Sequence, residues 1–343
     1  MSVKKCVIAG AGTGKTTYLL KLALNAPETC NVLYLTYTEA ASAHFETQIK
    51  HLRGAVPSNI TIMTWFSFLL SQGVRPFPYP LPGFRPKGIQ FTEGKVKQQR
   101  GVRRGQPAYY ITDNQQDVFS SRLADLACMC DEQVNGAVVT RISDIYQLIL
   151  VDEAQDLSSY DYDYVEKLLR TPSSIVIVGD PRQRTYTTSN EGAHLNETIF
   201  DYIANNKLCE IDRSTLTTCY RCKPDVIELA NELFPDLPAL QPSDGTTDEY
   251  VKVLTKEEFS RQAANAKLAM HLTWQSKSLP ISGCQTMTMG ASKGSEFSDV
   301  AVWLTQPMSK WLVDRKSELK ATSRAKLYVA ITRSQNNLWL IKP

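Results

Sequence analysis

A glycine-rich stretch near the start of the chain carries residue types that can hold a phosphate chain. It reads Ala9-Gly10-Ala11-Gly12-Thr13-Gly14-Lys15-Thr16-Thr17. The glycines let backbone N–H groups approach phosphate oxygens, and a helix beginning after them adds partial positive charge. We expect Lys15 to meet the β- and γ-phosphates of ATP and the Thr16 hydroxyl to reach Mg²⁺. The strict pattern has glycine where Ala9 stands, but a plain strand-to-helix turn needs neither the lysine nor three glycines.

An acidic pair farther along the chain can complete such a site. The apolar run at residues 146–151 leads directly into Asp152 and Glu153. At the carboxyl end of a strand, Asp152 can reach the Mg²⁺ shell, and Glu153 can polarise the attacking water as a general base. A second apolar run, residues 174–179, precedes Gln183, which can sense the γ-phosphate or orient that water. These side chains predict hydrolysis of a nucleoside triphosphate.

Alternating strands and helices are expected to position these groups. Apolar runs predict strands at residues 6–8, 31–36, 60–64, 146–151, 174–179, 251–254, 285–288, 300–304 and 338–341. Helices are predicted at residues 18–24, 37–52, 116–133, 225–234, 256–274 and 325–334. Apolar strands that alternate with helices predict the α/β class, with parallel sheets covered on both faces.

Composition and charge narrow the class of protein. The 343 residues allow about two domains, and 43% hydrophobic with 21% charged residues is typical of a soluble globular chain. The net charge of +3 is too small to prove a nucleic-acid partner. The first eleven residues resemble a secretory signal only faintly, because the apolar run is short and leads into the phosphate-binding stretch. No run is long enough to span a membrane, so we expect a cytoplasmic protein without a membrane partner.

The eight cysteines follow no regular disulfide framework. In a cytosolic nucleotide-binding chain, reduced thiols are expected. Cys219-Tyr-Arg-Cys222 has the spacing of metal ligands, and Cys128-Met-Cys130 could supply more. A closed zinc site needs four ligands and no second clean pair exists, so we do not expect a structural metal.

A basic, proline-containing segment interrupts the alternation. Five prolines fall between residues 76 and 86, and residues 85–104 hold seven lysines or arginines against the single acid Glu93. Tyr109 and Tyr110 follow. The segment is predicted to be an insertion that is either a solvated basic loop or a contact for nucleic acid.

Eight stretches, in order, resemble those of UvrD/Rep-type superfamily-one DNA helicases. They are residues 9–17, 36–41, 64–68, 150–156, 178–186, 219–221, 288–297 and 328–334. The resemblance implies two RecA-like lobes of the P-loop NTPase fold, with ATP between them and translocation on single-stranded DNA, normally 3′ to 5′. The lobes are expected at residues 1–72 with 136–212 and at 213–343, with a small basic insertion at 73–135. Because Arg221 and Thr288 are 67 residues apart (288 minus 221), the family's large accessory subdomain cannot fit, so the chain is a compact form.

The resemblance also implies roles in the ATP site for residues beyond the phosphate-binding stretch. These are Asp152, Glu153, Gln155, Gln183, Tyr220, Arg221, Glu296 and Arg333. Gln155 and Gln183 would couple the γ-phosphate to the DNA face. Tyr220 would stack on adenine and Glu296 would touch the ribose. Arg221 and Arg333, the latter as an arginine finger, would reach the γ-phosphate from the second lobe.

On the DNA-facing surface the resemblance implies a second set of residues. These are Tyr37, Thr38, Thr64, Trp65, Phe66, Tyr186 and Thr288. Aromatic rings there can stack on bases without reading sequence, and hydroxyls can bind phosphates; the alternative for the rings is core packing. Phe66 and Gly290 replace histidines that are usual in the family, and Thr188 replaces a base-stacking tryptophan. The chain upstream of the phosphate-binding stretch lacks the family's adenine-reading glutamine.

Three functions are compatible with these residues. The first is an ATP-driven DNA translocase or helicase, with RNA left open as a substrate. The second is a nucleic-acid-stimulated ATPase switch that regulates a protein partner such as a nuclease without unwinding. A small-molecule kinase would also use the phosphate-binding stretch, but it does not explain Gln183, Arg221 and Arg333.

Overall fold

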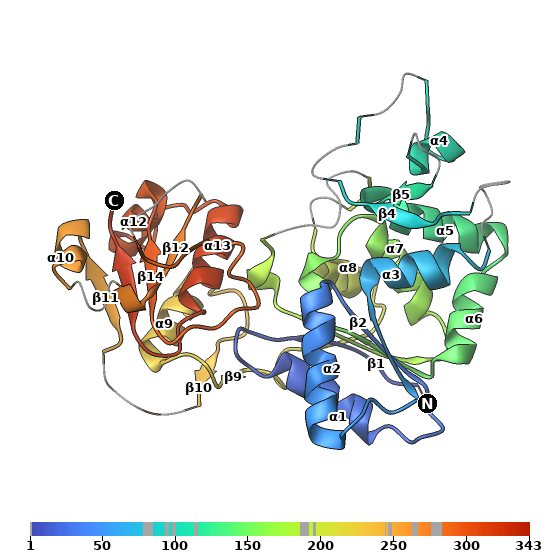
Figure 1. Cartoon of the computed structure of the whole chain (residues 1–343), viewed down its shortest axis with the longest axis horizontal. Coiled ribbons are helices and arrows are strands. Elements are labelled where there is room, and N and C mark those ends of the chain that lie inside the picture. Colours follow the sequence, from blue (N-terminus) through green and yellow to red (C-terminus); the bar gives the residue numbers. More distant parts are fainter. Residues whose placement is uncertain are drawn as a thin grey trace. The chain divides into compact units, whose positions relative to one another are not determined.

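The computed structural model of the chain forms two compact units. It describes residues 2–77, 85–92, 96–97, 101–112, 116–185, 192–194, 197–243, 245, 249–262, 267–275 and 283–343. The first unit comprises Met1–Val7, Thr16–Gly179 and Thr187–Asp212, and the second comprises Ile8–Lys15, Asp180–Tyr186 and Arg213–Pro343. Figure 1 shows both units and labels many of their elements.

The described part of the first unit is built on a six-stranded sheet of order β3-β2-β6-β7-β1-β8. The strands are β1 (Lys4–Ile8), β2 (Val32–Thr36), β3 (Ile60–Thr64), β6 (Leu148–Val151), β7 (Ser174–Gly179) and β8 (Glu210–Asp212). The pairs β2–β3, β2–β6, β6–β7 and β1–β8 are parallel. All five residues of β2 are buried, as expected of a strand covered on both faces.

Helices and short helical turns follow the strands of this unit. They are α1 (Lys15–Asn25), α2 (Glu39–Arg53), α3 (Trp65–Phe68), the π-helix η1 (Leu69–Val74), α4 (Pro107–Tyr110), the 3₁₀ turns η2 (Ser120–Arg122) and η3 (Ala154–Asp156), α5 (Leu123–Gln133), α6 (Ala137–Ile145), α7 (Tyr160–Leu169) and α8 (Ile199–Asn205). Helix α2 begins where the Thr38 hydroxyl accepts the Ala41 N–H and ends at Gly54, whose φ of 80° suits glycine. Its buried face stacks the Phe45 ring on Tyr34 of β2, with ring centroids 3.5 Å apart.

The predicted insertion contains a small parallel pair, β4 (Gly88–Gln90) with β5 (Asp117–Phe119). One prediction there is wrong, because the expected helix at residues 116–133 starts only at Leu123, after β5 and η2. Arg104 holds this segment to α5: its Nη2 lies 2.7 Å from the buried Asp125 carboxylate. The Tyr110 hydroxyl donates to the same carboxylate at 3.0 Å.

The described part of the second unit has a five-stranded sheet of order β11-β15-β14-β12-β13, with every neighbouring pair parallel. Its strands are β11 (Val251–Leu254), β12 (Met270–Thr273), β13 (Thr286–Thr288), β14 (Val300–Trp303) and β15 (Leu338–Ile341). The other elements are η4 (Pro181–Gln183), β9 (Thr218–Cys219), α9 (Pro224–Leu233), β10 (Gln241–Pro242), α10 (Lys256–Arg261), α12 (Gln306–Val313) and α13 (Ala321–Ile331). The predicted α/β class with parallel sheets is confirmed.

The helix expected at residues 256–274 is a second wrong prediction. Helix α10 ends at Arg261, and residues 270–273 form β12 inside the sheet. The short run Met270-His-Leu-Thr is nearly all buried between β13 and β14, so sheet pairing decides its conformation. Within the described residues, no helix is long and apolar enough to cross a membrane.

Candidate nucleotide site and nucleic-acid surface

The predicted phosphate-binding stretch forms a turn between β1 and α1. Gly12 and Gly14 have φ values of 68° and 78°, which L side chains rarely adopt. The Thr13 hydroxyl and the Lys15 ammonium each donate to the Gly10 carbonyl at 3.0 Å. The lysine is therefore folded over the turn from the first residue of α1, where the helix N-terminus favours anions.

The two predicted magnesium ligands meet in the first unit. The Thr16 hydroxyl donates to Asp152 Oδ2 at 3.2 Å, although the residues are 136 positions apart. The Tyr34 hydroxyl donates to the same oxygen at 2.9 Å. Burial, and then the Asp152 carboxylate, raise the pKa of Tyr34 well above its usual value, so Tyr34 stays a neutral donor. A hydroxyl and a carboxylate are the hard oxygen donors that Mg²⁺ takes, so this pair fits the predicted ion.

Glu153, the predicted general base, stands in a strained backbone position. Its φ of 53° is in the left-handed region, at the junction of β6 and η3. The Gln155 amide donates to its carboxylate. Gly179, at the end of β7, leaves the space that Gln155 needs, because a Cβ there would lie 2.6 Å from Gln155 Oε1. The predicted base and one predicted coupling glutamine are thus held together.

Gln183 belongs to a buried network in the second unit that also contains the phosphate-binding turn. Its amide donates to Asp180 Oδ2 at 2.8 Å, and the Tyr328 hydroxyl donates to the same oxygen at 3.0 Å. The Ala11 N–H donates to that hydroxyl at 3.0 Å. Asp180 Oδ1 lies 3.2 Å from the guanidinium of Arg182. Sequence reasoning gave no role to Tyr328 or Asp180, although both lie in stretches that carry the family resemblance.

The two predicted γ-phosphate arginines both contact Thr332, Arg221 through its carbonyl and Arg333 through its hydroxyl. Arg221 Nη1 donates to Thr332 O at 3.3 Å, and its Nε donates to Glu296 at 2.8 Å. Arg333 is 2% exposed and donates to Val329 O and Ser295 O at 3.0 and 3.1 Å. Glu296, expected at the ribose, is the ion-pair partner of Arg221 in this structure.

Tyr220 presents its ring to solvent. The side chain is 72% exposed, and its backbone N–H donates to Gly12 O at 2.9 Å. The ring is therefore accessible for the predicted stacking on a base, and its backbone is tied to the phosphate-binding turn.

The nucleic-acid prediction for Trp65 is wrong in this structure. Its side chain is 1% exposed, and its indole N–H donates to Asp161 at 2.7 Å. The ring packs against those of Phe68 and Tyr164. A ring enclosed in this way cannot stack on a base, so core packing explains Trp65.

The neighbouring aromatic residues form a different surface. Phe66 is 6% exposed and lies between the rings of Tyr37 and Phe91, whose centroids are 5.7 and 5.4 Å away. Phe91 is 70% exposed, and sequence reasoning missed it. The signal available in the sequence was an aromatic residue inside the basic insertion.

The predicted hydroxyl contacts are already used as hydrogen-bond acceptors. Thr38 and Thr64 cap α2 and α3, and Thr288 accepts the Ala291 N–H at 3.2 Å. Thr38 is exposed and Thr64 is buried. Tyr186 lies outside the described residues.

The basic insertion carries several exposed cations, and one of them, Arg104, is held in an ion pair. Lys87, Lys97 and Arg103 are exposed, whereas Arg104 pairs with Asp125 and lies over the Tyr160 ring at 4.6 Å. Lys95, Arg100 and Glu93 lie outside the described residues. Arg104 therefore stabilises the insertion instead of serving as a free phosphate contact.

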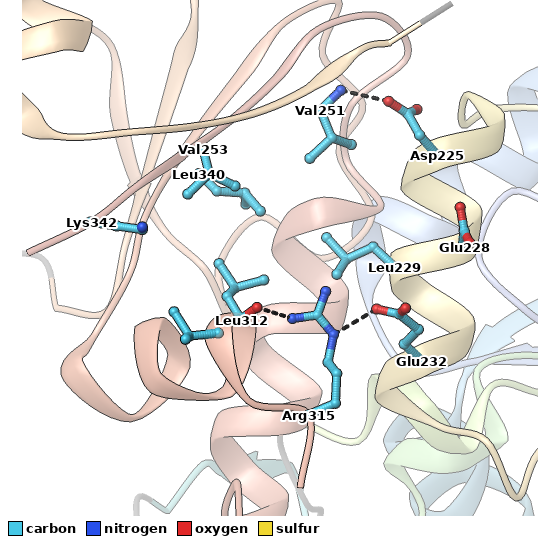
Figure 2. A pocket seen from close by; sticks show the side chains of 11 residues that line it. Asp225, Glu228, Leu229, Glu232, Val251, Val253, Leu312, Arg315, Leu340 and Lys342 are labelled. Atoms are coloured by element: carbon cyan, nitrogen blue, oxygen red, sulfur yellow. Dashed lines mark hydrogen bonds and ion pairs between the residues drawn. The ribbon is translucent and has the colours of Figure 1, made fainter. Parts of the chain in front are cut away.

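A pocket of about 450 Å³ lies elsewhere in the second unit, against α9, β11, β15 and α12 (Figure 2). It contains none of the predicted site residues. Asp225 accepts the Val251 N–H at 2.6 Å, and Glu232 lies 2.7 Å from Arg315 Nε. These contacts hold α9 against β11 and the residues after α12, so Asp225, Glu232 and Arg315 have a structural role in the pocket wall.

Comparison with known protein families identifies the family to which this chain belongs. The viral superfamily 1 RNA helicase core domain matches residues 116–342, and the AAA domain matches residues 2–189. This chain belongs to the superfamily 1 helicases. The predicted family and the prediction of an ATP-hydrolysing enzyme of helicase type are confirmed at this level, and the two parallel-sheet units of the helicase are consistent with RecA-like lobes.

Individual relatives of the helicase agree over limited lengths. It is 30% identical over 104 residues to the RecBCD enzyme subunit RecB of Chlamydia muridarum and 29% identical to that of Chlamydia trachomatis. These matches cover 29% of this chain and 10% of each relative. The arterivirus helicase nonstructural protein 10, solved with DNA, has a TM-score of 0.50 at 15% identity, over 99% of this chain and 61% of that one. That likeness concerns the fold alone.

Proposed function

We propose that this helicase uses ATP to translocate on single-stranded DNA, moving 3′ to 5′. The observation that carries the ATPase half is the meeting of Thr16 and Asp152, with their oxygens 3.2 Å apart. This contact brings the residue that follows the phosphate-binding lysine next to the acidic residue that follows β6, and hydrolysis requires both. We also propose the lobes at residues 1–72 with 136–212 and at 213–343, the insertion at 73–135, and a cytoplasmic location.

The role that we propose for each residue follows from its contacts. Lys15 and the turn hold the triphosphate, and Thr16 with Asp152 hold Mg²⁺, which offsets phosphate charge. Glu153 accepts the proton of the attacking water while Gln155 orients its carboxylate. Arg221 and Arg333 supply positive charge to the γ-phosphate as it leaves.

The substrate half is supported by the aromatic and basic surface of the first unit. Tyr37, Phe66 and Phe91 form a ring cluster, and Phe91 belongs to the same insertion as the exposed cations. Aromatic rings and cations together suit single strands. Comparing ATPase rates with oligo-dT and oligo-U tests the choice of DNA. Equal or greater stimulation by oligo-U would contradict it.

A second function, an ATPase switch that regulates a protein partner without unwinding, is favoured by two observations. Trp65 is enclosed in the core, and Thr188 replaces a tryptophan, so two stacking rings are missing. A strand-displacement assay run beside a DNA-stimulated ATPase assay separates the two functions. Stimulated hydrolysis without displacement or translocation would support the switch.

A further inference from the structure

The Cys219-Tyr220-Arg221-Cys222 segment places two thiols side by side. It runs from the end of β9 toward the start of α9. The Cys222 N–H donates to Cys219 Sγ at 3.5 Å, and the one proton of the Cys222 thiol can point to that sulfur or to Thr332 O. Both residues are buried, at 0% and 6% exposure. Within the described residues, no group of three His, Cys, Asp or Glu side chains could hold a metal, so the pair lacks the ligand set of a metal site.

The pair lies against groups that the proposed ATPase uses. A Cβ added to Gly12 would lie 2.9 Å from Cys219 Sγ, so the sulfur packs directly on the phosphate-binding turn. Cys222 Sγ donates to Thr332 O at 3.6 Å, the carbonyl that also accepts Arg221 Nη1. Arg333 follows that carbonyl in the chain.

The two thiols differ in acidity in the way a reactive pair requires. The hydrogen bond from Cys222, helped by backbone N–H groups and the Arg221 guanidinium and opposed by burial, lowers the pKa of Cys219 to about 6. The same hydrogen bond, with burial, raises the pKa of Cys222. At neutral pH Cys219 is therefore largely a thiolate, the nucleophilic form of cysteine.

We propose that Cys219 and Cys222 form a reversible disulfide that acts as a redox switch on the ATP site. The oxidant is hydrogen peroxide, a small uncharged molecule. The Cys219 thiolate attacks one peroxide oxygen, and the O–O bond breaks to give a sulfenic acid and hydroxide. Cys222 then attacks that sulfur, the S–S bond forms and the S–O bond breaks. The two sulfurs lose two electrons to the peroxide. The Cys222 proton leaves with the displaced oxygen as one water, and the hydroxide takes a proton from solvent to become a second.

Closing the disulfide changes the neighbourhood of Arg221. The bond requires an S–S distance of about 2.0 Å, and Cys222 loses the proton it donates to Thr332 O. Arg221 lies inside the four-residue loop that the bond closes, so the bond shifts the backbone that carries its guanidinium and disturbs its contacts with Glu296 and Thr332. The effect on hydrolysis rests on the proposed function, whereas the disulfide itself does not.

The test treats the reduced full chain with hydrogen peroxide, blocks remaining thiols and maps disulfides by mass spectrometry without reduction. We expect a Cys219–Cys222 link and a loss of about tenfold or more in DNA-stimulated ATPase, both reversed by dithiothreitol. The double variant Cys219→Ser with Cys222→Ser should keep its own starting rate after peroxide. Cys284→Ser, which changes a half-buried cysteine outside the pair, should respond like wild type.

Two results would overturn the proposal. One is the absence of the Cys219–Cys222 link while other cysteines are oxidised. The other is a full link with an unchanged ATPase rate, or an equal loss in the double variant. A chain that forms the link reversibly but hydrolyses no ATP when reduced would contradict the proposed function and leave the disulfide site standing.

Discussion

Tyr328→Phe should destabilise the second unit without changing the shape of its core. The ring is fully buried, and its hydroxyl is the acceptor of the Ala11 N–H and a donor to Asp180, each at 3.0 Å. Removing it leaves a buried N–H without this acceptor, at about 1–3 kcal/mol. It also removes a hydrogen bond to a charged group, about 1.5–3 kcal/mol. Asp180 keeps its hydrogen bond from Gln183 and its ion pair with Arg182. We therefore expect the free energy of unfolding to fall by about 3 kcal/mol, near the lower end of the summed range.

Urea unfolding of wild type and variant measures this loss, and hydrogen exchange of the peptide that contains Ala11 locates it. Tyr162→Phe is the matched control, since that hydroxyl donates to a neutral backbone carbonyl, Glu197 O at 3.2 Å, and not to a carboxylate. We expect the control to lose about half as much. ATP turnover should fall in Tyr328→Phe as well, because Gln183 shares the Asp180 oxygen. A Tyr328→Phe loss below about 0.5 kcal/mol, with unchanged exchange at Ala11, would refute this reasoning.

Three further substitutions test the proposed site. Glu153→Gln keeps the side-chain size but loses the base, so turnover should fall about 10²–10⁴-fold while ATP still binds; a near-normal rate would remove Glu153 from the mechanism. Arg333→Ala should lower DNA-stimulated hydrolysis about 10³–10⁵-fold with nucleotide binding retained; retained stimulation would make this buried arginine structural. Replacing Lys87, Lys97 and Arg103 with alanine should flatten the log affinity–log salt slope on single strands by ~0.7 per lost contact. An unchanged slope would place these exposed cations away from the nucleic acid.

The features that the sequence predicted well depend on residues that are close together in the chain. The phosphate-binding turn depends on neighbouring residues, with glycines where φ is positive and a lysine at the start of α1. The strand that leads into Asp152 could also be predicted, because its apolar run and the acidic pair after it are adjacent in the chain. These features need only short-range chemistry.

What the sequence could not predict depended on distant partners. Trp65 is enclosed because Asp161, 96 positions later, accepts its indole N–H. Residues 270–273 form a strand because β13 and β14 pair with it on either side in the sheet. Tyr328 reaches Ala11 across 317 positions, and no periodicity in the chain signals that pairing.

The backbone at Glu153 sets turnover against folding. A left-handed conformation costs a residue with a side chain about 1 kcal/mol or more, and glycine adopts it almost freely. Glu153→Gly would remove this cost together with the catalytic carboxylate, but it would also lose the hydrogen bond from Gln155 and free the unfolded chain, which offsets the gain. A more heat-resistant form of this helicase must therefore gain its stability at other positions.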